Sequence, residues 1–204
     1  MKKILYTILC LVSMMTFSSC SEADDSTYEF DNWQQRNDTY FNSIYSQAEA
    51  SIGQEKDEWR IFNKWSKVED AIGTDKTNKI VVKVIQKGTG KESPLYSDSV
   101  RVHYEGRLME TPEHPEGTVF DCSWTGDYNP NTMVPTKFLA GGLVDGFTTA
   151  LLHMHVGDRW KVYIPYNLAY GASKQSSIPA YSTLVFDITL HSFSRPGYTM
   201  PKFQ

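Results

Sequence analysis

The sequence predicts an α+β protein in which a twisted antiparallel β-sheet wraps around one short α-helix, preceded by a helical extension. Two observations support this fold class. After Lys79, several segments alternate apolar and polar residues with a period of two, and only residues 144–154 carry a strong helical pattern. Before Lys79, apolar residues recur at intervals of three and four. We therefore place the extension at residues 29–78 and the main domain, with a short C-terminal tail, at residues 79–204.

The first residues of the chain have the pattern of a bacterial secretory signal. A positively charged start precedes an apolar run at residues 4–17, which is too short to span a bilayer stably. Ser18, Ser19 and Cys20 follow, as in the lipobox of bacterial lipoproteins. We expect a signal peptide at residues 1–19, lipidation of Cys20 and an acidic tether at residues 20–28. The exported protein would be anchored to a membrane, facing the periplasm or the cell surface. The alternative is cleavage nearby that leaves Cys20 free.

Cysteine content and charge limit the chemistry and the partners. Of the three cysteines, Cys10 lies in the signal and Cys20 at its end, so Cys122 has no partner for an intramolecular disulfide. A hydrophobic core must therefore stabilise the fold. The formal net charge of −4 argues against nucleic acid as a partner.

The extension is predicted to begin with an amphipathic helix. Its apolar residues at helical spacing are Phe30, Trp33, Tyr40, Phe41, Ile44, Tyr45 and Ala48. We expect a shorter helical piece after it, with Trp59, Phe62 and Trp65 on one side. These aromatic residues are expected to pack on the main domain or on a second copy of the protein rather than to bind a cofactor.

Predicted strands cover residues 79–88, 99–108, 158–164 and 183–193. Their one-sided alternation predicts a sheet with one face in the core and the other in water. The expected core-facing residues are Val100, Val102, Tyr104, Trp160, Val162, Ile164, Leu184, Phe186, Ile188 and Leu190. Arg101, His103 and Glu105 are expected to face water.

The segment "VDGFTTALLHM" is the predicted helix of the main domain. Asp145 is placed to cap its N-terminus, and Gly157 marks the end of the segment. The residues that share its apolar side are Phe147, Ala150, Leu151 and Met154.

The sequence contains no clear pattern for metal, cofactor or covalent chemistry. His153 and His155 are two residues apart on a helix, so they do not face each other, and no spacing typical of zinc occurs. Nothing in the sequence indicates an activating histidine for Cys122. We therefore expect no metal and no cofactor.

With its strands and helix in order, the sequence resembles the macrolide-binding FKBP family of peptidyl-prolyl cis-trans isomerases. The matching segments are "VRVHYEGRL", "GTVFDCS", "GGLVDGFTTALLHMHVGDRWKVYIP", "LAYG" and "IPAYSTLVFDITL". They occur in the order of the family and cover nearly all of residues 79–193. The resemblance implies the FKBP fold, a sheet curled around a short helix, and prolyl isomerase activity on proline-containing polypeptides.

The resemblance also implies the residues of the site. Catalytic roles fall on Tyr104, Asp121, Tyr170 and Phe186. Substrate-binding positions are Phe120, Phe138, Leu143, Val144, Phe147 and Ile178. Tyr170 would donate its hydroxyl to a substrate carbonyl, and Phe147 would form the floor. For Asp121 two interpretations stay open: a position at the rim close to the twisting carbonyl or a buried tyrosine hydroxyl, or a carboxylate that accepts from nearby donors at a strand end.

The sequence departs from the family in ways that bear on the ligand. The best-known members have tryptophan at the floor, whereas Phe147 lacks an indole donor, so this departure bears more on binding of the macrolides tacrolimus and rapamycin than on isomerase activity. The loops "METPEHPE" and "WTGDYNPNTMVPT" are longer than in compact members, and the second is expected beside the pocket.

The implied function is isomerisation that assists the folding of exported proteins, by desolvation and positioning of X-Pro bonds in an aromatic pocket. A first alternative is a non-catalytic proline-peptide-binding or chaperone module on the same fold. A second is a scaffold that forms a homodimer through the N-terminal helix.

Overall fold

The computed structural model describes residues 29–54, 58–67, 75–129 and 132–201. The predicted signal peptide, Cys20 and the tether lie outside these residues. No helix within these ranges combines the length and the apolar character that a membrane span requires.

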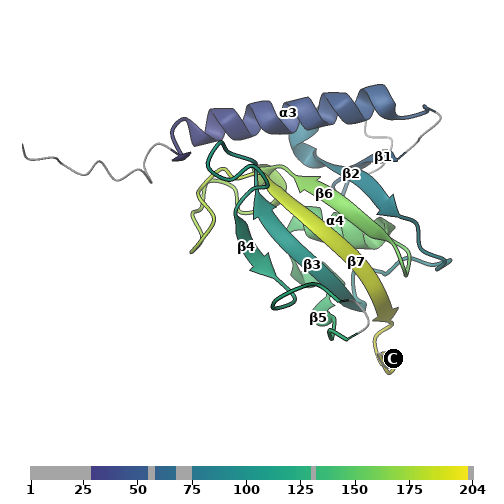
Figure 1. Cartoon of the computed structure of the whole chain (residues 1–204). Coiled ribbons are helices and arrows are strands. Elements are labelled where there is room, and N and C mark those ends of the chain that lie inside the picture. Colours follow the sequence, from purple (N-terminus) through teal and green to yellow (C-terminus); the bar gives the residue numbers. More distant parts are fainter. Residues whose placement is uncertain (1–28, 55–57, 68–74, 130–131, 202–204) are drawn as a thin grey trace, which may run out of the picture.

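The described residues form one antiparallel sheet, as the sequence predicted (Figure 1). Its strands follow the order β1-β2-β6-β7-β3-β4, and β5 pairs with β3 beside this path. The strands are β1 (Trp59–Asn63), β2 (Lys79–Gln86), β3 (Ser99–Leu108), β4 (Val119–Cys122), β5 (Thr136–Leu139), β6 (Arg159–Ile164) and β7 (Leu184–Ser194). Short 3-10 turns lie at η1 (Lys76–Asn78), η2 (Ala140–Gly142) and η3 (Tyr166–Leu168).

The helix α4 (Asp145–His153) packs on the inner face of the sheet and lies behind it in Figure 1. Phe147, Ala150 and Leu151 are buried, as is Met154 directly after the helix. All the strand residues predicted to face the core are also buried in this cluster. The predicted sheet curled around one short helix is thus confirmed.

Asp145 does not cap α4, so that prediction is wrong. The N-cap position is Val144, and Asp145 is the first residue of the helix. Its carboxylate instead accepts a hydrogen bond from the Trp65 indole at 3.0 Å and pairs with Lys64 at 2.6 Å. Burial raises the pKa of Asp145, but the hydrogen bonds from Lys64 and Trp65 outweigh it and hold the pKa below its usual value. Asp145 therefore fastens the extension to α4.

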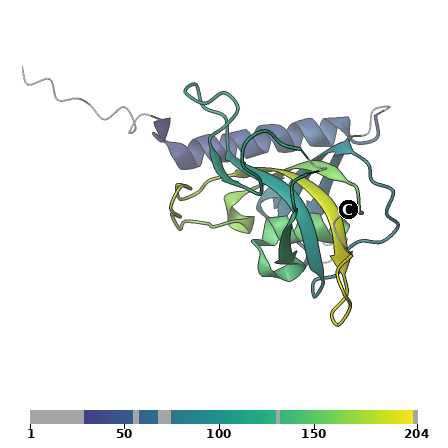
Figure 2. The same cartoon turned by 60° about the horizontal axis from the view of Figure 1, so that its bottom comes forward.

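The helix α3 (Trp33–Ser51) covers part of the outer face of the sheet (Figure 2). Its buried residues are Trp33, Asn37, Phe41, Tyr45 and Ala48. They follow the predicted helical spacing, and Asn37 is the one polar residue among them. Phe41, Tyr45 and Ala48 belong to one cluster with Val81, Tyr163 and Val185, which lie side by side across β2, β6 and β7. The expectation of an outer face in water is wrong here, because these outward positions are apolar.

Asn37 links α3 to the start of β7 by hydrogen bonds. It is fully buried, and its Oδ1 accepts from the Thr183 backbone N–H at 2.7 Å. Its amide donates to the Trp33 carbonyl at 2.8 Å. In the same region the Trp33 indole donates to Ser182 Oγ at 2.8 Å. Since buried polar groups need partners, these bonds fix α3 at one position on the sheet.

The second helical piece predicted for the extension is wrong, because Trp59–Asn63 form the strand β1. This strand pairs with β2, so the sheet begins before Lys79. Trp59 and Ile61 pack in the outer cluster, whereas Phe62 packs in the inner core. The side chains therefore alternate between the two faces, as strand residues do.

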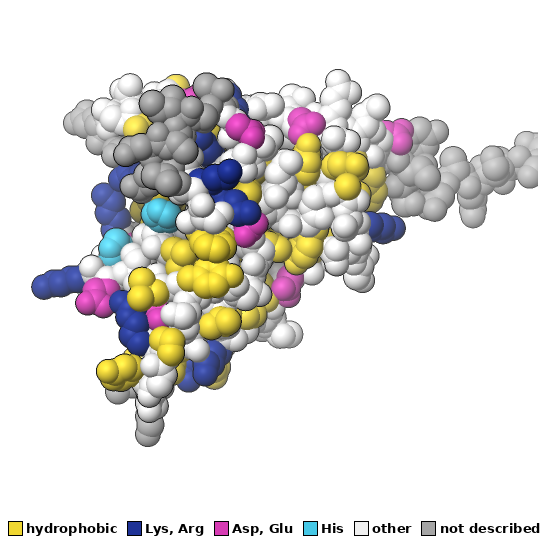
Figure 3. Space-filling model, turned by 180° about the vertical axis from the view of Figure 1, so that it is seen from behind, with side chains coloured by type: hydrophobic (Ala, Val, Ile, Leu, Met, Phe, Trp, Pro, Cys, Tyr) yellow, Lys and Arg dark blue, Asp and Glu magenta, His cyan; other side chains and the backbone are white. Residues whose placement is uncertain are grey.

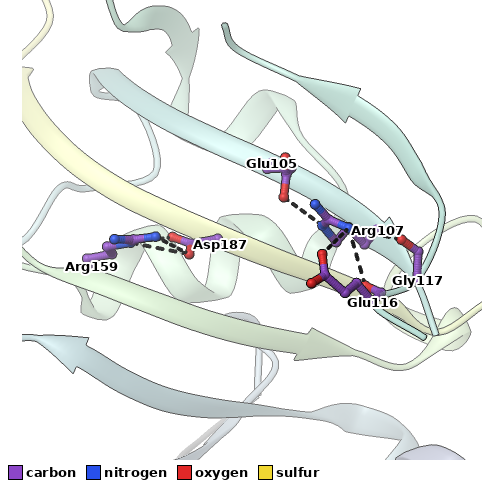
Figure 4. A network of polar contacts seen from close by, with 6 residues as sticks. All are labelled: Glu105, Arg107, Glu116, Gly117, Arg159 and Asp187. Carbon is purple, nitrogen blue, oxygen red and sulfur yellow. Dashed lines mark hydrogen bonds and ion pairs between the residues drawn. The ribbon is translucent and has the colours of Figure 1, made fainter. Parts of the chain in front are cut away.

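The rest of the outer face is partly charged and partly covered by a loop. Arg159 forms a bidentate pair with Asp187, and Arg107 bonds Glu105 at 2.6 Å (Figure 4). His103, expected in water, is only 1% exposed, because the rings of Trp124 and Tyr128 lie against it at centroid distances of 6.4 and 5.4 Å. The described part of the long loop after Trp124 thus begins on the outer face.

Candidate active site

A cavity of about 120 Å³ lies between the sheet and the N-terminal part of α4. Nine of the ten predicted site residues line it: Tyr104, Phe120, Asp121, Phe138, Leu143, Val144, Phe147, Tyr170 and Phe186. They come from β3, β4, β5, the turn before α4, α4 itself, the turn after η3, and β7. Ile178 is not among them; it is buried in the core cluster, with 5% of its surface exposed.

Phe186 and Tyr104 lie at the centre of the rings that form this cavity. The Phe186 ring meets the rings of Phe147 and Phe120 edge-on, at centroid distances of 5.0 and 5.4 Å. The Tyr104 ring lies 5.9 Å from Phe147 and 5.7 Å from Phe138. Edge-to-face contacts of this kind stabilise a fixed ring arrangement, so the walls are apolar and held in place.

Gly106 is a site residue that the sequence analysis missed. It lies opposite Phe186 in the register of β3 and β7. A Cβ atom at this position would lie 2.5 Å from Phe120 Cζ and 2.6 Å from Phe186 Cε1. The absence of a side chain thus lets both rings close over the strand. The signal was a glycine inside an alternating strand, which commonly marks a close approach.

Tyr104 and Asp121 form a polar pair at the edge of the apolar cavity. The Tyr104 hydroxyl donates to Asp121 Oδ2 at 2.8 Å, and the Cys122 backbone N–H donates to Asp121 Oδ1 at 2.9 Å. Burial raises the pKa of Tyr104, and the Asp121 carboxylate raises it further, so the phenol remains a neutral donor. This geometry is compatible with both interpretations of Asp121, because the carboxylate lines the cavity beside a tyrosine hydroxyl and also accepts from a strand-end N–H.

Tyr170 lies at the mouth of the cavity, with 40% of its surface exposed. It follows η3, and the backbone of the next residue closes the turn, because Gly171 N–H donates to the Tyr166 carbonyl at 2.9 Å. Tyr181 N–H in turn donates to the Gly171 carbonyl at 2.8 Å. These bonds hold the backbone turn that carries Tyr170 at the mouth of the cavity.

The thiol of Cys122 is not an activated nucleophile. Burial raises the pKa of Cys122, which is the opposite of what a reactive thiol requires. In the described part of the chain, no group of three or more His, Cys, Asp or Glu side chains could hold a metal ion.

Larger hollows occur elsewhere on the surface, and their linings mix apolar with charged or polar side chains. One of about 320 Å³ lies on the outer face and is lined mainly by charged residues, among them Glu105, Arg107 and Lys161. The smaller cavity differs in that five aromatic rings form its walls and a sixth, that of Tyr170, lies at its mouth. It is below the roughly 300 to 1,000 Å³ of pockets that enclose drug-sized ligands, so it suits a single small ring.

A curled antiparallel sheet with one helix across its inner face and an aromatic cavity between them defines a domain of the FKBP class. The family model for FKBP-type peptidyl-prolyl cis-trans isomerases matches residues 90–191 of the chain. The chain therefore belongs to the FKBP-type peptidyl-prolyl cis-trans isomerase family.

Relatives with similar sequences carry related names. The macrophage infectivity potentiator of Trypanosoma cruzi is 40% identical over 119 residues, 58% of this chain and 55% of the relative. FkpA of Escherichia coli, named as an FKBP-type isomerase, is 36% identical over 122 residues, 60% of this chain and 40% of the relative. The chain thus spans about half the length of the relatives it matches.

Solved structures share the fold at lower sequence identity. The crystal structure of Escherichia coli FkpA is 24% identical with a TM-score of 0.54, and the match covers 95% of this chain and 71% of FkpA. An isomerase structure from Pseudomonas syringae gives a TM-score of 0.52 at 24% identity, covering 78% of this chain and 96% of that one.

Proposed function

We propose that the chain is a peptidyl-prolyl cis-trans isomerase that accelerates rotation about X-Pro bonds of polypeptides in the cavity between the sheet and α4. The observation that carries this proposal is the convergence of five aromatic rings on one small cavity: Tyr104, Phe120, Phe138, Phe147 and Phe186. These rings come from four strands and one helix, and their mutual contacts keep the cavity open to a prolyl ring.

Such a cavity lowers the rotation barrier through its poor solvation. The planar amide bond has partial double-bond character, with a barrier of about 18 to 20 kcal/mol. The planar state separates charge between oxygen and nitrogen, and twisting removes this separation. An apolar cavity therefore stabilises the twisted transition state relative to the planar ground state, and only such differential binding accelerates a reaction.

Two tyrosines have different parts in this mechanism. The hydroxyl of Tyr104 is already donated to Asp121, so this pair positions the Tyr104 ring in the wall of the cavity. Tyr170 is exposed at the mouth and can donate its hydroxyl to a carbonyl oxygen of the bound polypeptide. That bond would hold the chain on one side of the prolyl bond while the other side rotates.

The test is an isomerisation assay on a tetrapeptide that contains one proline. The wild-type protein should accelerate cis-trans exchange, and Phe147→Lys, which places a charge in the cavity, should abolish the acceleration in a protein that still folds. If the wild-type protein binds the peptide without faster exchange, the chain is a non-catalytic binding module and the proposal is wrong.

The same cavity is proposed to bind tacrolimus and rapamycin weakly. The resemblance to a macrolide-binding family supports binding, and the absence of an indole donor at Phe147 supports a low affinity. Phe147→Trp should raise affinity by about fivefold, since one net hydrogen bond contributes about 1 kcal/mol. Isothermal titration of both variants measures the difference.

We also propose that the protein acts on exported clients while anchored by lipid on Cys20. The apolar run at residues 4–17 and the sequence Ser18-Ser19-Cys20 support this location. In bacterial cells that make this chain, a labelled fatty acid should be incorporated into the protein, and the labelled protein should sediment with membranes. Cys20→Ser should remove the label, and label that persists would exclude Cys20 as the site.

A further inference from the structure

Three exposed apolar side chains lie beside the rim of the cavity without lining it. Trp65 is 37% exposed, Tyr96 45% and Leu139 52%. We name them the Trp65 surface. Figure 3 views the molecule from the side of α4 and shows hydrophobic side chains gathered on this face. Contiguous exposed apolar surface commonly marks an interaction site.

Trp65 is held in a fixed position on α4. Its backbone N–H donates to Thr149 Oγ1 at 3.0 Å, and its indole donates to Asp145 Oδ1 at 3.0 Å. Lys64 pairs with the second oxygen of Asp145 at 2.6 Å. The Trp65 ring lies 4.4 Å from the Tyr96 ring. Two segments far apart in sequence thus present one aromatic surface.

The Trp65 surface is continuous with the cavity through residues 139–145. The Tyr96 ring lies so close to Gly141 that a Cβ there would be 2.5 Å from it. Leu139 Cβ would lie 3.5 Å from a Cβ on Gly142. The next two residues, Leu143 and Val144, line the cavity. Leu139 and Leu143 are four positions apart in the chain, so at most about 14 Å separates them, and an extended polypeptide that leaves the cavity over this rim reaches the surface within about four residues.

We propose that the Trp65 surface binds an apolar side chain of the unfolded client, about three or four residues from the proline held in the cavity. This inference rests on the proposed function. The cavity admits little more than one ring, so the client chain must cross the rim, and an exposed Trp-Tyr pair is the kind of surface on which binding energy concentrates. Trp65 lies outside the residues that the family model matches, 90–191, so the extension supplies this contact to the domain.

The experiment compares two substrates: a proline tetrapeptide, which occupies only the cavity, and an unfolded protein whose refolding is limited by a prolyl bond. The variants are Trp65→Ser and Leu139→Ser, with Ile85→Ser as the control, since Ile85 is 49% exposed on β2 and outside both sites. The ratio of kcat/KM on the protein to kcat/KM on the tetrapeptide should fall about tenfold in the two surface variants, or about 1.4 kcal/mol. The control should keep the wild-type ratio.

The proposal is overturned if the ratio is unchanged in both surface variants. Equal losses of kcat/KM on the two substrates also leave the ratio unchanged, and they would mean that Trp65 only positions α4. Sedimentation provides a second test. If the wild-type protein self-associates and the surface variants do not, the Trp65 surface binds a second copy of the chain, and the proposal is overturned. If the wild-type protein turns over neither substrate, the proposed function fails separately. Binding of a permanently unfolded protein then decides: a roughly tenfold rise in Kd in the surface variants supports the inference, and an unchanged Kd refutes it.

Discussion

Replacing Gly106 by alanine should close the cavity while leaving the sheet folded. The added Cβ would lie 2.5 Å from Phe120 Cζ and 2.6 Å from Phe186 Cε1. Carbon atoms in contact prefer about 3.5 to 4.0 Å, so each ring must move by about 1 Å. Overpacking of this kind costs about 1 to 3 kcal/mol of stability.

The displaced rings are walls of the cavity, so the change should also appear in catalysis. A misplacement of about 1 Å can reduce a rate by about 100-fold, and we expect kcat/KM on a proline tetrapeptide to fall between about tenfold and 100-fold. The assay is cis-trans exchange at matched protein concentration, with thermal unfolding by circular dichroism to confirm the fold.

A matched glycine separates this effect from a general effect of alanine. A Cβ on Gly142 would meet its nearest neighbour, Leu139 Cβ, at 3.5 Å, which is ordinary contact. Gly142→Ala should therefore change kcat/KM by less than about twofold, since nothing has to move. A folded Gly106→Ala protein with wild-type kcat/KM would refute the argument that this glycine makes room for the rings.

Tyr104→Phe removes the hydroxyl that donates to Asp121 and should lower the free energy of unfolding by about 0.5 to 1.5 kcal/mol, measured by urea denaturation. Asn37→Leu leaves the buried Thr183 N–H without its acceptor and should cost at least about 2 kcal/mol in the same assay. His103 should make the protein less stable in acid: burial lowers its pKa, and a neighbouring histidine lowers it further, so below about pH 6.5 the unfolded chain binds a proton that the folded protein does not. The free energy of unfolding should fall from about pH 7 to about pH 5, and His103→Gln should reduce this dependence, while His191, whose pKa burial also lowers, should retain part of it.

Each of these predictions has a result that contradicts it. Asn42 is an exposed asparagine on the same helix, so equal losses in Asn42→Leu and Asn37→Leu would mean that helix propensity, not the buried bond, is responsible. A Tyr104→Phe protein as stable as wild type would show that water replaces the phenol on Asp121. An acid dependence as steep in His103→Gln as in the wild-type protein would show that His103 does not contribute to it.

The inner half of the structure was predictable from the sequence because the burial of alternating apolar residues decides it. Residues such as Val100, Val162 and Ile188 alternate with polar residues, and the inner core buries them as that pattern requires. The cavity followed from the resemblance, which brought together residues as far apart as Tyr104 and Phe186. Ile178 lies in the core outside the lining of the cavity, since a motif gives the neighbourhood of a side chain and not the direction in which it points, and its role in binding stays a prediction.

The outer half was harder to predict, because the residues that cover it are distant in sequence. Val81 and Tyr163 break the polar side of their strands, and they are the sequence signal that something covers them. Nothing in the local pattern says that α3 does so. Trp59 and Phe62 fit helical spacing as well as strand alternation, and pairing with β2 decides between the two.

The N-terminal extension is therefore part of the domain and not an appendage. It covers the outer face with α3, adds the edge strand β1, and reaches the inner side at Trp65, where it bonds α4. The apolar side of α3 is already buried in this way, so a dimer through that side would first have to uncover Tyr163 and its neighbours. Removing the extension to test dimerisation would expose the same apolar surface and create association of its own. The dimer hypothesis stays a prediction, and charged substitutions on the exposed side of α3, which leave the sheet covered, are the test that can decide it.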